Sequence, residues 1–221
     1  FEHVTKCWDG RNVLNDLSFE IKRGEIFTIV GPSGTGKSVT LKHMVRLLTP
    51  TSGSIWVDGM EVSAAGADDV RQVRERFGYL FQGGALLGWL TVEENIALPL
   101  RERTKMPQAE IEGRVAEALR MVGLEGDGEK YPNEISGGMQ KRAGLARAII
   151  NRPEIVLYDE PTSGLDPVTA RTIDHLIQRL NDELGITSVV VTHDLQGALL
   201  IADRIAMLTG GRFVEDRKSV V

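Results

Sequence analysis

A glycine-rich stretch, Gly31-Pro32-Ser33-Gly34-Thr35-Gly36-Lys37-Ser38, fits the pattern G-x-x-x-x-G-K-[ST]. The mostly apolar residues 25–30 before it predict a buried strand, and residues 39–48 after it predict a helix. The pattern requires this context of strand, turn and helix. The order of these elements predicts an α/β fold around the loop.

The residue types of this loop suit the binding of phosphate. Glycine at positions 31, 34 and 36 allows backbone conformations in which successive N–H groups surround phosphate oxygens at the start of a helix. Lys37 adds a mobile positive charge, and Ser38 adds a hydroxyl group for Mg²⁺. The loop therefore predicts binding of a nucleoside triphosphate, but kinases, GTPases, motors and transporters all use such a loop.

Composition limits the class of protein. The 221 residues can form one sizeable core, with room for an inserted subdomain. A formal net charge of −5 gives no global basic field for nucleic acid, and a single cysteine, Cys7, excludes an internal disulfide framework. No apolar run approaches the roughly 18 residues of a membrane span, and no charged-then-apolar leader opens the sequence. We expect a cytosolic protein that does not bind nucleic acid.

Several other stretches have the patterns of strands. Alternating apolar and polar residues at 4–19 predict a β-hairpin around the turn Asp9-Gly10, and residues 54–59 predict a further strand that runs into a turn. A continuously apolar run, typical of a strand buried in a parallel sheet, lies at 155–158, and further strands are predicted at 77–81, 205–208 and, from β-branched residues, at 186–192.

Residues 91–150 have a helical pattern instead. Thr91 and Glu94 form a capping box, and Ser136 is expected to cap a helix at 137–150. This part of the chain therefore predicts an all-helical insertion within an α/β protein.

Two further helices are predicted by their start signals. Asp68 or Asp69 is expected to cap a short basic helix that precedes the strand at 77–81. Asp166-Pro167 starts a longer helix that ends at Gly185.

Acidic residues and a histidine follow two of the predicted buried strands. Asp159 and Glu160 come directly after the strand at 155–158, and His193 follows the strand at 186–192. An aspartate at the end of a strand beside the loop strand can hold Mg²⁺. The glutamate next to it can then orient or deprotonate a water that attacks the γ-phosphate. A kinase does not need this second acid, so the pair favours hydrolysis.

A second anion-binding surface is predicted in the helical segment. Ser136, Gly137 and Gly138 combine a hydroxyl group, two glycines and a helix N-terminus. Lys37 already completes the first phosphate site. Two phosphate-binding surfaces on one chain suggest that two chains share each nucleotide.

These motifs, in this order and spacing, resemble those of ABC-transporter ATPase subunits over essentially the whole chain. The loop at 31–38 is similar to their Walker A motif, residues 155–159 to Walker B, and residues 163–166 to the D-loop. Single positions that match the family are Trp8 (adenine-stacking aromatic), Gln82 (Q-loop glutamine), Glu160 (catalytic glutamate) and His193 (switch histidine).

The resemblance implies a P-loop NTPase (RecA-like) α/β core with an N-terminal antiparallel β subdomain and an inserted α-helical subdomain. It implies one ABC ATPase domain at 1–221. Within it, the nucleotide-binding core and the β subdomain would occupy 1–82 and 151–221, and the helical subdomain with the signature motif would occupy 83–150.

The resemblance also implies ATP and Mg²⁺ as cofactors. Catalytic roles are implied for Lys37, Gln82, Glu160 and His193, and metal binding for Ser38, Gln82 and Asp159. Contacts with ATP are implied for Trp8, Gly31, Pro32, Ser33, Gly34, Thr35, Gly36, Lys37, Ser38, Val39, Ser136, Gly137, Gly138 and Asp166.

A head-to-tail dimer with ATP between its subunits is implied as well, docked through permease subunits on the cytoplasmic face of the inner membrane. The signature departs from the usual L-S-G-G-Q, because Ile135 replaces Leu and Met139 replaces Gln. The anion-binding core Ser136 to Gly138 is retained. Any contact that the missing Gln side chain makes in the family is therefore in doubt.

Residues 81–87, 90–100 and 135–142 look like the ATPases of Mla/Mce-type lipid transport systems. This similarity implies transport of phospholipid or another lipid, with lipid-binding accessory proteins as further partners. An importer for amino acids or other small solutes is the alternative.

Other classes of P-loop protein fit less well. A DNA-repair or chromosome ATPase would carry a coiled coil between Gln82 and Ser136, where no sustained heptads occur. A translation-factor type would carry two cassettes, and a kinase or GTPase would lack the Ser136 motif. A non-catalytic cassette is disfavoured by Glu160 and His193.

Overall fold

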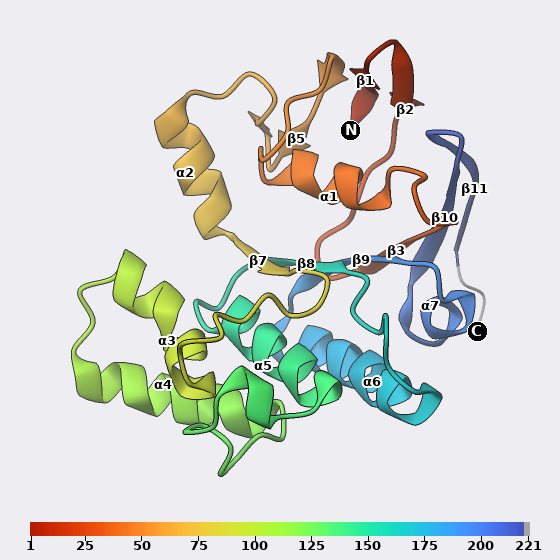
Figure 1. Ribbon diagram of the computed structural model, residues 1–221. Coiled ribbons are helices and arrows are strands. Elements are labelled where there is room, and N and C mark those ends of the chain that lie inside the picture. The colour runs from red at the N-terminus through yellow and green to blue at the C-terminus, as the bar shows by residue number, and fades with distance from the viewer. Residues whose placement is uncertain (219–221) are drawn as a thin grey trace.

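The computed structural model describes residues 1–218 (Figure 1). Its strands are β1 (Glu2–Trp8), β2 (Arg11–Leu17), β3 (Ile26–Val30), β4 (Ser52–Ser54), β5 (Trp56–Val57), β6 (Met60–Glu61), β7 (Phe77–Leu80), β8 (Ile155–Asp159), β9 (Thr187–Thr192), β10 (Arg204–Thr209) and β11 (Arg212–Lys218). Its helices are α1 (Lys37–Met44), α2 (Ala67–Glu75), α3 (Val92–Arg103), α4 (Gln108–Met121), α5 (Gly137–Ile149), α6 (Pro167–Leu184) and α7 (Leu195–Ile201), with a 3-10 turn at Pro132–Glu134. None of these helices is long and apolar enough to cross a lipid bilayer.

A mixed sheet with the strand order β11-β10-β3-β9-β8-β7 lies at the centre. All its strands run parallel except β11, which pairs antiparallel with β10. Every residue of β3 and β9 is buried, as expected for apolar strands covered on both faces of a parallel sheet. Val30 pairs with Thr192, and Asp159 pairs with Val191. The carboxyl ends of β3, β8 and β9 therefore meet at one edge of the sheet.

The N-terminal strands form a small antiparallel sheet, in the order β2-β1-β4, on the side of the central sheet that also carries α1 (Figure 1). β5 and β6 form a separate hairpin beside it. Leu14 and Leu17 of the β1–β2 hairpin share a buried cluster with Phe27 of β3 and Leu41 of α1. This packing holds the small sheet against β3 and α1, the two elements that flank the glycine-rich loop.

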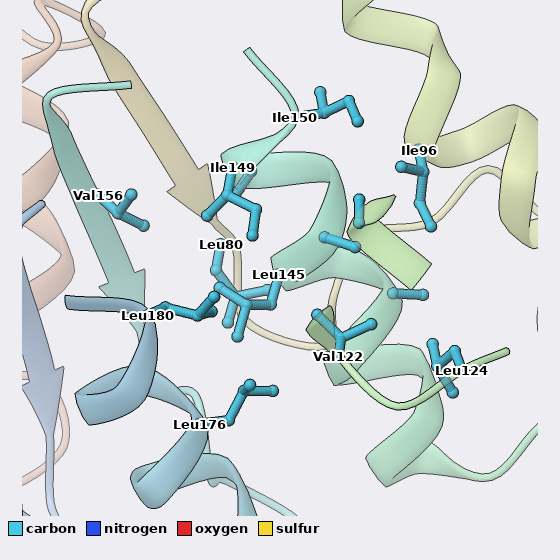
Figure 2. Packing of buried hydrophobic residues seen from close by; sticks show 14 of the residues in the cluster. Leu80, Ile96, Val122, Leu124, Leu145, Ile149, Ile150, Val156, Leu176 and Leu180 are labelled. Carbon is cyan, nitrogen blue, oxygen red and sulfur yellow. The ribbon is translucent and has the colours of Figure 1, made fainter. Parts of the chain in front are cut away.

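The helices α3 to α6 lie on the opposite side of the central sheet, where α5 and α6 pack against its strands and α3 and α4 pack against α5 (Figure 1). Leu145 of α5 lies in the middle of this buried cluster, near Leu80 of β7 and near Leu176 and Leu180 of α6 (Figure 2). Further buried members of the cluster, labelled in the same view, are Ile96, Val122, Leu124, Ile149, Ile150 and Val156. α5 is therefore a central element that is packed against both the sheet and the other helices.

The structure confirms the predicted α/β fold with an antiparallel β subdomain and a helical insertion. The capping box is present, because Thr91 Oγ1 accepts from the Glu94 N–H at 3.2 Å and Glu94 Oε2 accepts from the Thr91 N–H at 2.9 Å. Such caps stabilise a helix by about 1 kcal/mol. The division at 82/83 and 150/151 stays a prediction, and its last three residues, 219–221, lie outside the described residues.

Two local details differ from the sequence prediction. Gly66 is the N-cap of α2, and Asp68 and Asp69 lie in the first turn, where their charges complement the helix dipole without capping it. The short helix α7 has no sequence prediction, because a glycine, Gly197, interrupts its apolar run. Asp194 starts α7 by accepting a hydrogen bond from the Gly197 N–H at 3.1 Å.

Candidate nucleotide-binding site

The loop at 31–38 fills the space between the end of β3 and the start of α1. A Cβ atom at Gly31 would lie 2.3 Å from the carbonyl oxygen of Leu208, so only glycine fits beside β10. Gly36 has a φ of 104°, and a Cβ there would lie 2.9 Å from the carbonyl oxygen of Val13. The loop is thus held between β10 and the β1–β2 hairpin. It brings free backbone N–H groups to the positive end of α1.

The ammonium group of Lys37 is buried within this loop. Its Nζ atom donates hydrogen bonds to the carbonyl oxygens of Gly31 at 2.7 Å and Pro32 at 3.0 Å. The same atom lies 3.3 Å from Oε1 of Glu160, and the two side chains are only 5% and 10% exposed. Buried charges of this kind need a partner of opposite sign. A phosphate group that binds the loop can replace the carboxylate as the partner of Lys37.

Glu160 has a φ of 51°, in the left-handed region that residues other than glycine rarely adopt. Its N–H donates to the carbonyl oxygen of Val191 at 2.9 Å, and its own carbonyl oxygen accepts from Lys141 Nζ at 3.0 Å. Nδ1 of His193 lies 2.7 Å from Oε2 of Glu160. Because a carboxylate only accepts, Nδ1 carries the proton of this hydrogen bond. These contacts hold the Glu160 carboxylate between Lys37 and His193.

Asp159 joins this group from the end of β8. Ser38 Oγ donates to Asp159 Oδ1 at 2.6 Å, and the Tyr79 hydroxyl donates to Oδ2 at 3.3 Å. Burial, together with the charge of Asp159, raises the pKa of Tyr79 and keeps its hydroxyl protonated as a donor. Hydroxyl and carboxylate oxygens are the protein ligands that Mg²⁺ takes beside nucleotide phosphates, so Ser38 and Asp159 fit that ion.

The predicted second surface has a helix-cap geometry. Ser136 Oγ accepts from the Met139 N–H at 3.3 Å and so starts α5. A Cβ at Gly138 would lie 2.5 Å from Cγ2 of Thr169, which shows how closely the start of α5 approaches α6. Among the described residues, no hydrogen bond or ion pair joins Ser136 to the loop at 31–38. The two anion-binding surfaces are therefore separate within one chain.

Trp8 lies at the end of β1, 41% exposed, with Lys6 Nζ 5.1 Å from its ring centroid. It belongs to the β1–β2 hairpin, whose second strand approaches Gly36 through Val13. Gln82 is exposed and follows β7 by two residues, next to the strand that ends in Asp159. Among residues 1–218, neither side chain forms a hydrogen bond or ion pair with Lys37, and the roles of Trp8 and Gln82 stay predictions.

Asp166 is the N-cap of α6, where its Oδ1 accepts from the N–H groups of Val168 at 3.0 Å and Thr169 at 3.1 Å. The pKa of Asp166 lies below its usual range, mainly because Thr169 donates hydrogen bonds to the carboxylate. The side chain therefore has a structural role beside Gly138 on the neighbouring helix. Its predicted contact with ATP stays a prediction.

Three side chains of this region have no sequence prediction. Lys141 is buried under Glu160, Tyr79 donates to Asp159, and Arg171 pairs with Asp194, the residue after His193. Lys141 lies in a polar run of α5 that reads as a solvent-facing surface. Tyr79 reads as an ordinary strand aromatic. A sequence pattern gives no signal that distinguishes these buried polar contacts from exposed ones.

The buried side chain of Asp174, on α6, leads to a prediction about how stability depends on pH. Asp174 pairs with Arg171 at 2.9 Å, and burial raises the pKa of Asp174 from 3.8 to about 6, with the charge of Asp194 adding to the shift and Arg171 opposing it. The folded protein therefore keeps a proton there that the unfolded chain has already lost. Stability from this group falls as pH rises from about 4 to about 6 and is absent above that range.

We expect Asp174→Asn to be more stable, relative to the parent protein, at pH 8 than at pH 5, because the amide has no charge to bury. Urea unfolding at both pH values measures this difference. Asp182→Asn, on the exposed side of the same helix, is the matched control and should show no such pH dependence. A variant that loses stability relative to the parent as pH rises would contradict the prediction.

The fold and these residues define a P-loop nucleotide-binding cassette. The ABC transporter family matches residues 14–163, which is more than half of the sequence, so the chain belongs to that family.

Curated relatives of this family are similar over most of the chain. The chain is 45% identical over 205 residues to a probable ribonucleotide transport ATP-binding protein, mkl, of Mycobacterium leprae, covering 93% of this chain and 59% of that protein. It is also 45% identical over 203 residues to the methionine import ATP-binding protein MetN of Carboxydothermus hydrogenoformans, covering 92% and 60%. The chain thus spans about three-fifths of the length of these relatives.

Solved structures support the same fold. The ATP-binding cassette MJ0796, in a dimeric post-hydrolysis state bound to ADP and phosphate, matches with a TM-score of 0.91 at 36% identity, covering 100% of this chain and 98% of that one. cbiO1 from Clostridium perfringens, part of the ABC transporter complex cbiONQ, matches with a TM-score of 0.90 at 30% identity, covering 99% and 87%.

Proposed function

We propose that this chain binds and hydrolyses ATP to power a membrane transporter, with two copies sharing each nucleotide. The observation that carries the proposal is the Glu160 carboxylate, held by His193 and placed beside Lys37 at the carboxyl edge of the sheet. The family membership supports it.

The residues of the site divide the work of hydrolysis. Lys37 and the loop N–H groups bind the β- and γ-phosphates. When Lys37 takes a phosphate partner, Oε1 of Glu160 becomes free to accept a proton from the attacking water, while His193 continues to orient Oε2. Ser38 and Asp159, with Gln82 as the further predicted ligand, would hold Mg²⁺, which would offset the negative charge of the phosphates.

The second anion-binding surface supports a shared site. Within residues 1–218, no hydrogen bond or ion pair joins Ser136, Gly137 or Gly138 to the loop of their own chain, and in our proposal they face ATP bound to a second copy. The dimeric state in which MJ0796 was solved with ADP and phosphate supports this arrangement for a similar chain. Trp8 stacks on the adenine ring, and Asp166 lies at the boundary between the two copies.

The loop after Gln82 borders a groove that we propose as the docking site for a permease subunit. It has a volume of about 550 Å³ and is lined by residues from several elements, among them Leu47, Phe81, Leu98, Pro99, Arg103 and Arg147. Leu47 is 50% exposed and Phe81 is 37% exposed, so apolar surface is available for contact. We place a cytoplasmic segment of the permease here. The chain would then act as a peripheral subunit on the cytoplasmic face of the inner membrane.

Phospholipid or another lipid is the proposed cargo. The support is the similarity of residues 81–87, 90–100 and 135–142 to Mla/Mce-type ATPases, since the first of these stretches borders the groove. Lipid-binding accessory proteins would complete such a system. The names of the relatives mkl and MetN favour the second candidate, a transporter of a small polar solute such as methionine or a ribonucleotide.

Purification of the full-length protein with its membrane partners tests the cargo. We expect mass spectrometry to find phospholipid retained by the complex beyond a matched, unrelated membrane protein in the same detergent. ATPase activity should respond to added lipid and not to methionine or ribonucleotides. Stimulation by one of those solutes, without lipid enrichment, would replace the lipid proposal by the second candidate.

A further inference from the structure

Lys141 is a charged side chain in the interior of the protein. It is 4% exposed and lies on α5, whose N-terminus carries Ser136. Its Nζ atom donates to the backbone carbonyl oxygen of Glu160 at 3.0 Å. The contact therefore joins the helical layer to the residue that follows β8.

Burial of this ammonium group is unfavourable for stability. Burial lowers the pKa of Lys141, and the charges of Glu160 and Asp159 oppose that shift without cancelling it. An apolar side chain of similar length would avoid this loss of hydration, and the Glu160 carbonyl oxygen would keep its hydrogen bond from the Ser163 N–H. Stability therefore does not account for a lysine at this position. What lysine adds, compared with an apolar side chain, is the hydrogen bond to Glu160.

Three parts of the chain form hydrogen bonds with the backbone of Glu160. Its N–H donates to Val191 of β9 at 2.9 Å, and its carbonyl oxygen accepts from the Ser163 N–H at 3.2 Å as well as from Lys141. Lys141 supplies the contact from α5. Because Glu160 has a φ of 51°, a strained conformation, such surrounding contacts decide where its carboxylate points.

The same helix also holds the loop after Gln82. Arg147, two turns after Lys141 on α5, donates to the carbonyl oxygens of Gly84 at 2.8 Å and Ala85 at 2.9 Å. The helix α5 thus carries Ser136 at its start, the Lys141 contact with Glu160 after about one turn, and the hydrogen bonds from Arg147 to this loop near its end. A displacement of α5 is transmitted to the Glu160 backbone through Lys141.

We propose that Lys141 is a positioning residue for ATP hydrolysis: it fixes the Glu160 backbone relative to α5, so that the carboxylate is aligned when Ser136 engages the nucleotide of the second copy. This inference rests on the proposed role of Glu160 as the base. Lys141 itself touches neither the nucleotide nor the attacking water in this scheme.

Lys141→Met in the full-length protein, purified with its membrane partners, tests the proposal. We expect kcat for ATP hydrolysis to fall about tenfold, because a base that is displaced by a fraction of an ångström acts less well, while KM stays within about twofold. The thermal midpoint, Tm, should not fall, since the variant no longer buries the ammonium group and the Glu160 carbonyl oxygen keeps its hydrogen bond from Ser163. Lys141→Arg, which can still donate to the carbonyl oxygen, should recover most of the lost kcat.

Arg142→Met is the matched control. Arg142 is the next basic residue on α5 and donates to the carbonyl oxygens of Val122 and Gly123 instead. It should keep kcat within about twofold of the parent. If Lys141→Met keeps its kcat, raises KM alone, or loses kcat together with Tm and without recovery in Lys141→Arg, the positioning role is wrong.

The single variant Glu160→Gln distinguishes the assignment of Glu160 as the base from the positioning role of Lys141. Substantial hydrolysis by that variant would remove the base assignment whatever Lys141 does. Loss of hydrolysis in Glu160→Gln together with a normal kcat in Lys141→Met would leave the base in place and overturn only the role of Lys141.

Discussion

Glu160→Gln is expected to lower the rate of ATP hydrolysis by at least about 100-fold while ATP still binds. The amide has nearly the same shape and can still accept the hydrogen bond from Nδ1 of His193, but it cannot take a proton from the attacking water. Lys37 would keep its phosphate partner. The variant should therefore stop at the stage before hydrolysis, with nucleotide bound.

Two measurements check this result. Steady-state release of phosphate gives the loss in rate, and binding of a fluorescent ATP analogue shows that the site is intact. Size-exclusion chromatography with ATP and Mg²⁺ should show more dimer than the parent protein does, because hydrolysis no longer separates the two copies. Glu183→Gln, at an exposed position of α6, is the control and should behave as the parent.

A Glu160→Gln rate within about tenfold of the parent would show that another group activates the water. Absence of any gain in dimer, in a variant that binds ATP, would contradict the shared site for the subunit on its own.

Lys37→Ala is expected to remove most ATP binding and to lower hydrolysis by at least about 100-fold. The β- and γ-phosphates lose the charge that the loop offers them, and the shortened side chain cannot be replaced by the neighbouring N–H groups alone. Nucleotide binding by titration and phosphate release measure both losses. Lys42→Ala, on the same helix, is the control, since this lysine makes no contact with Glu160 among the described residues.

The Lys37 substitution also has a consequence for stability. It leaves the Glu160 carboxylate, 10% exposed, without its buried cation, which costs about 3 kcal/mol in comparable buried pairs. Adding Glu160→Gln to Lys37→Ala should recover part of that loss, because the uncompensated charge is gone. Urea unfolding without nucleotide compares the variants. A double variant less stable than Lys37→Ala would show that the ion pair is not the source of the loss.

Much of the site can be predicted from local patterns. The loop at 31–38 has a fixed spacing, and Asp159, Glu160 and His193 follow apolar runs that a parallel sheet brings to one edge. Caps such as Ser136 and Asp166 follow from hydroxyl and carboxylate residues placed before helical runs. The strands, helices and caps among these predictions are confirmed, because the physical cause of each lies within a few residues of the feature.

Other features depend on contacts between distant parts of the chain. Lys37 and Glu160 are 123 positions apart in sequence and meet only because β3 and β8 both flank β9. The burial of Lys141 depends on the packing of α5 under the sheet, which its polar neighbours in sequence conceal. Gly66 caps α2 through its backbone conformation, so the acids beside it give a misleading signal.

The strand order also governs when the site can form during synthesis. β3, which leads into the phosphate loop, has β9 and β10 as its neighbours in the sheet, and both are translated more than 150 residues later. Until those strands leave the ribosome, β3 has unpaired edges and the loop has no fixed scaffold. ATP therefore cannot act as a template for the nascent chain. The nucleotide site therefore assembles only after β9 and β10 have been made, and protection of the apolar β3 segment until then falls to the α1 and β1–β2 elements or to chaperones.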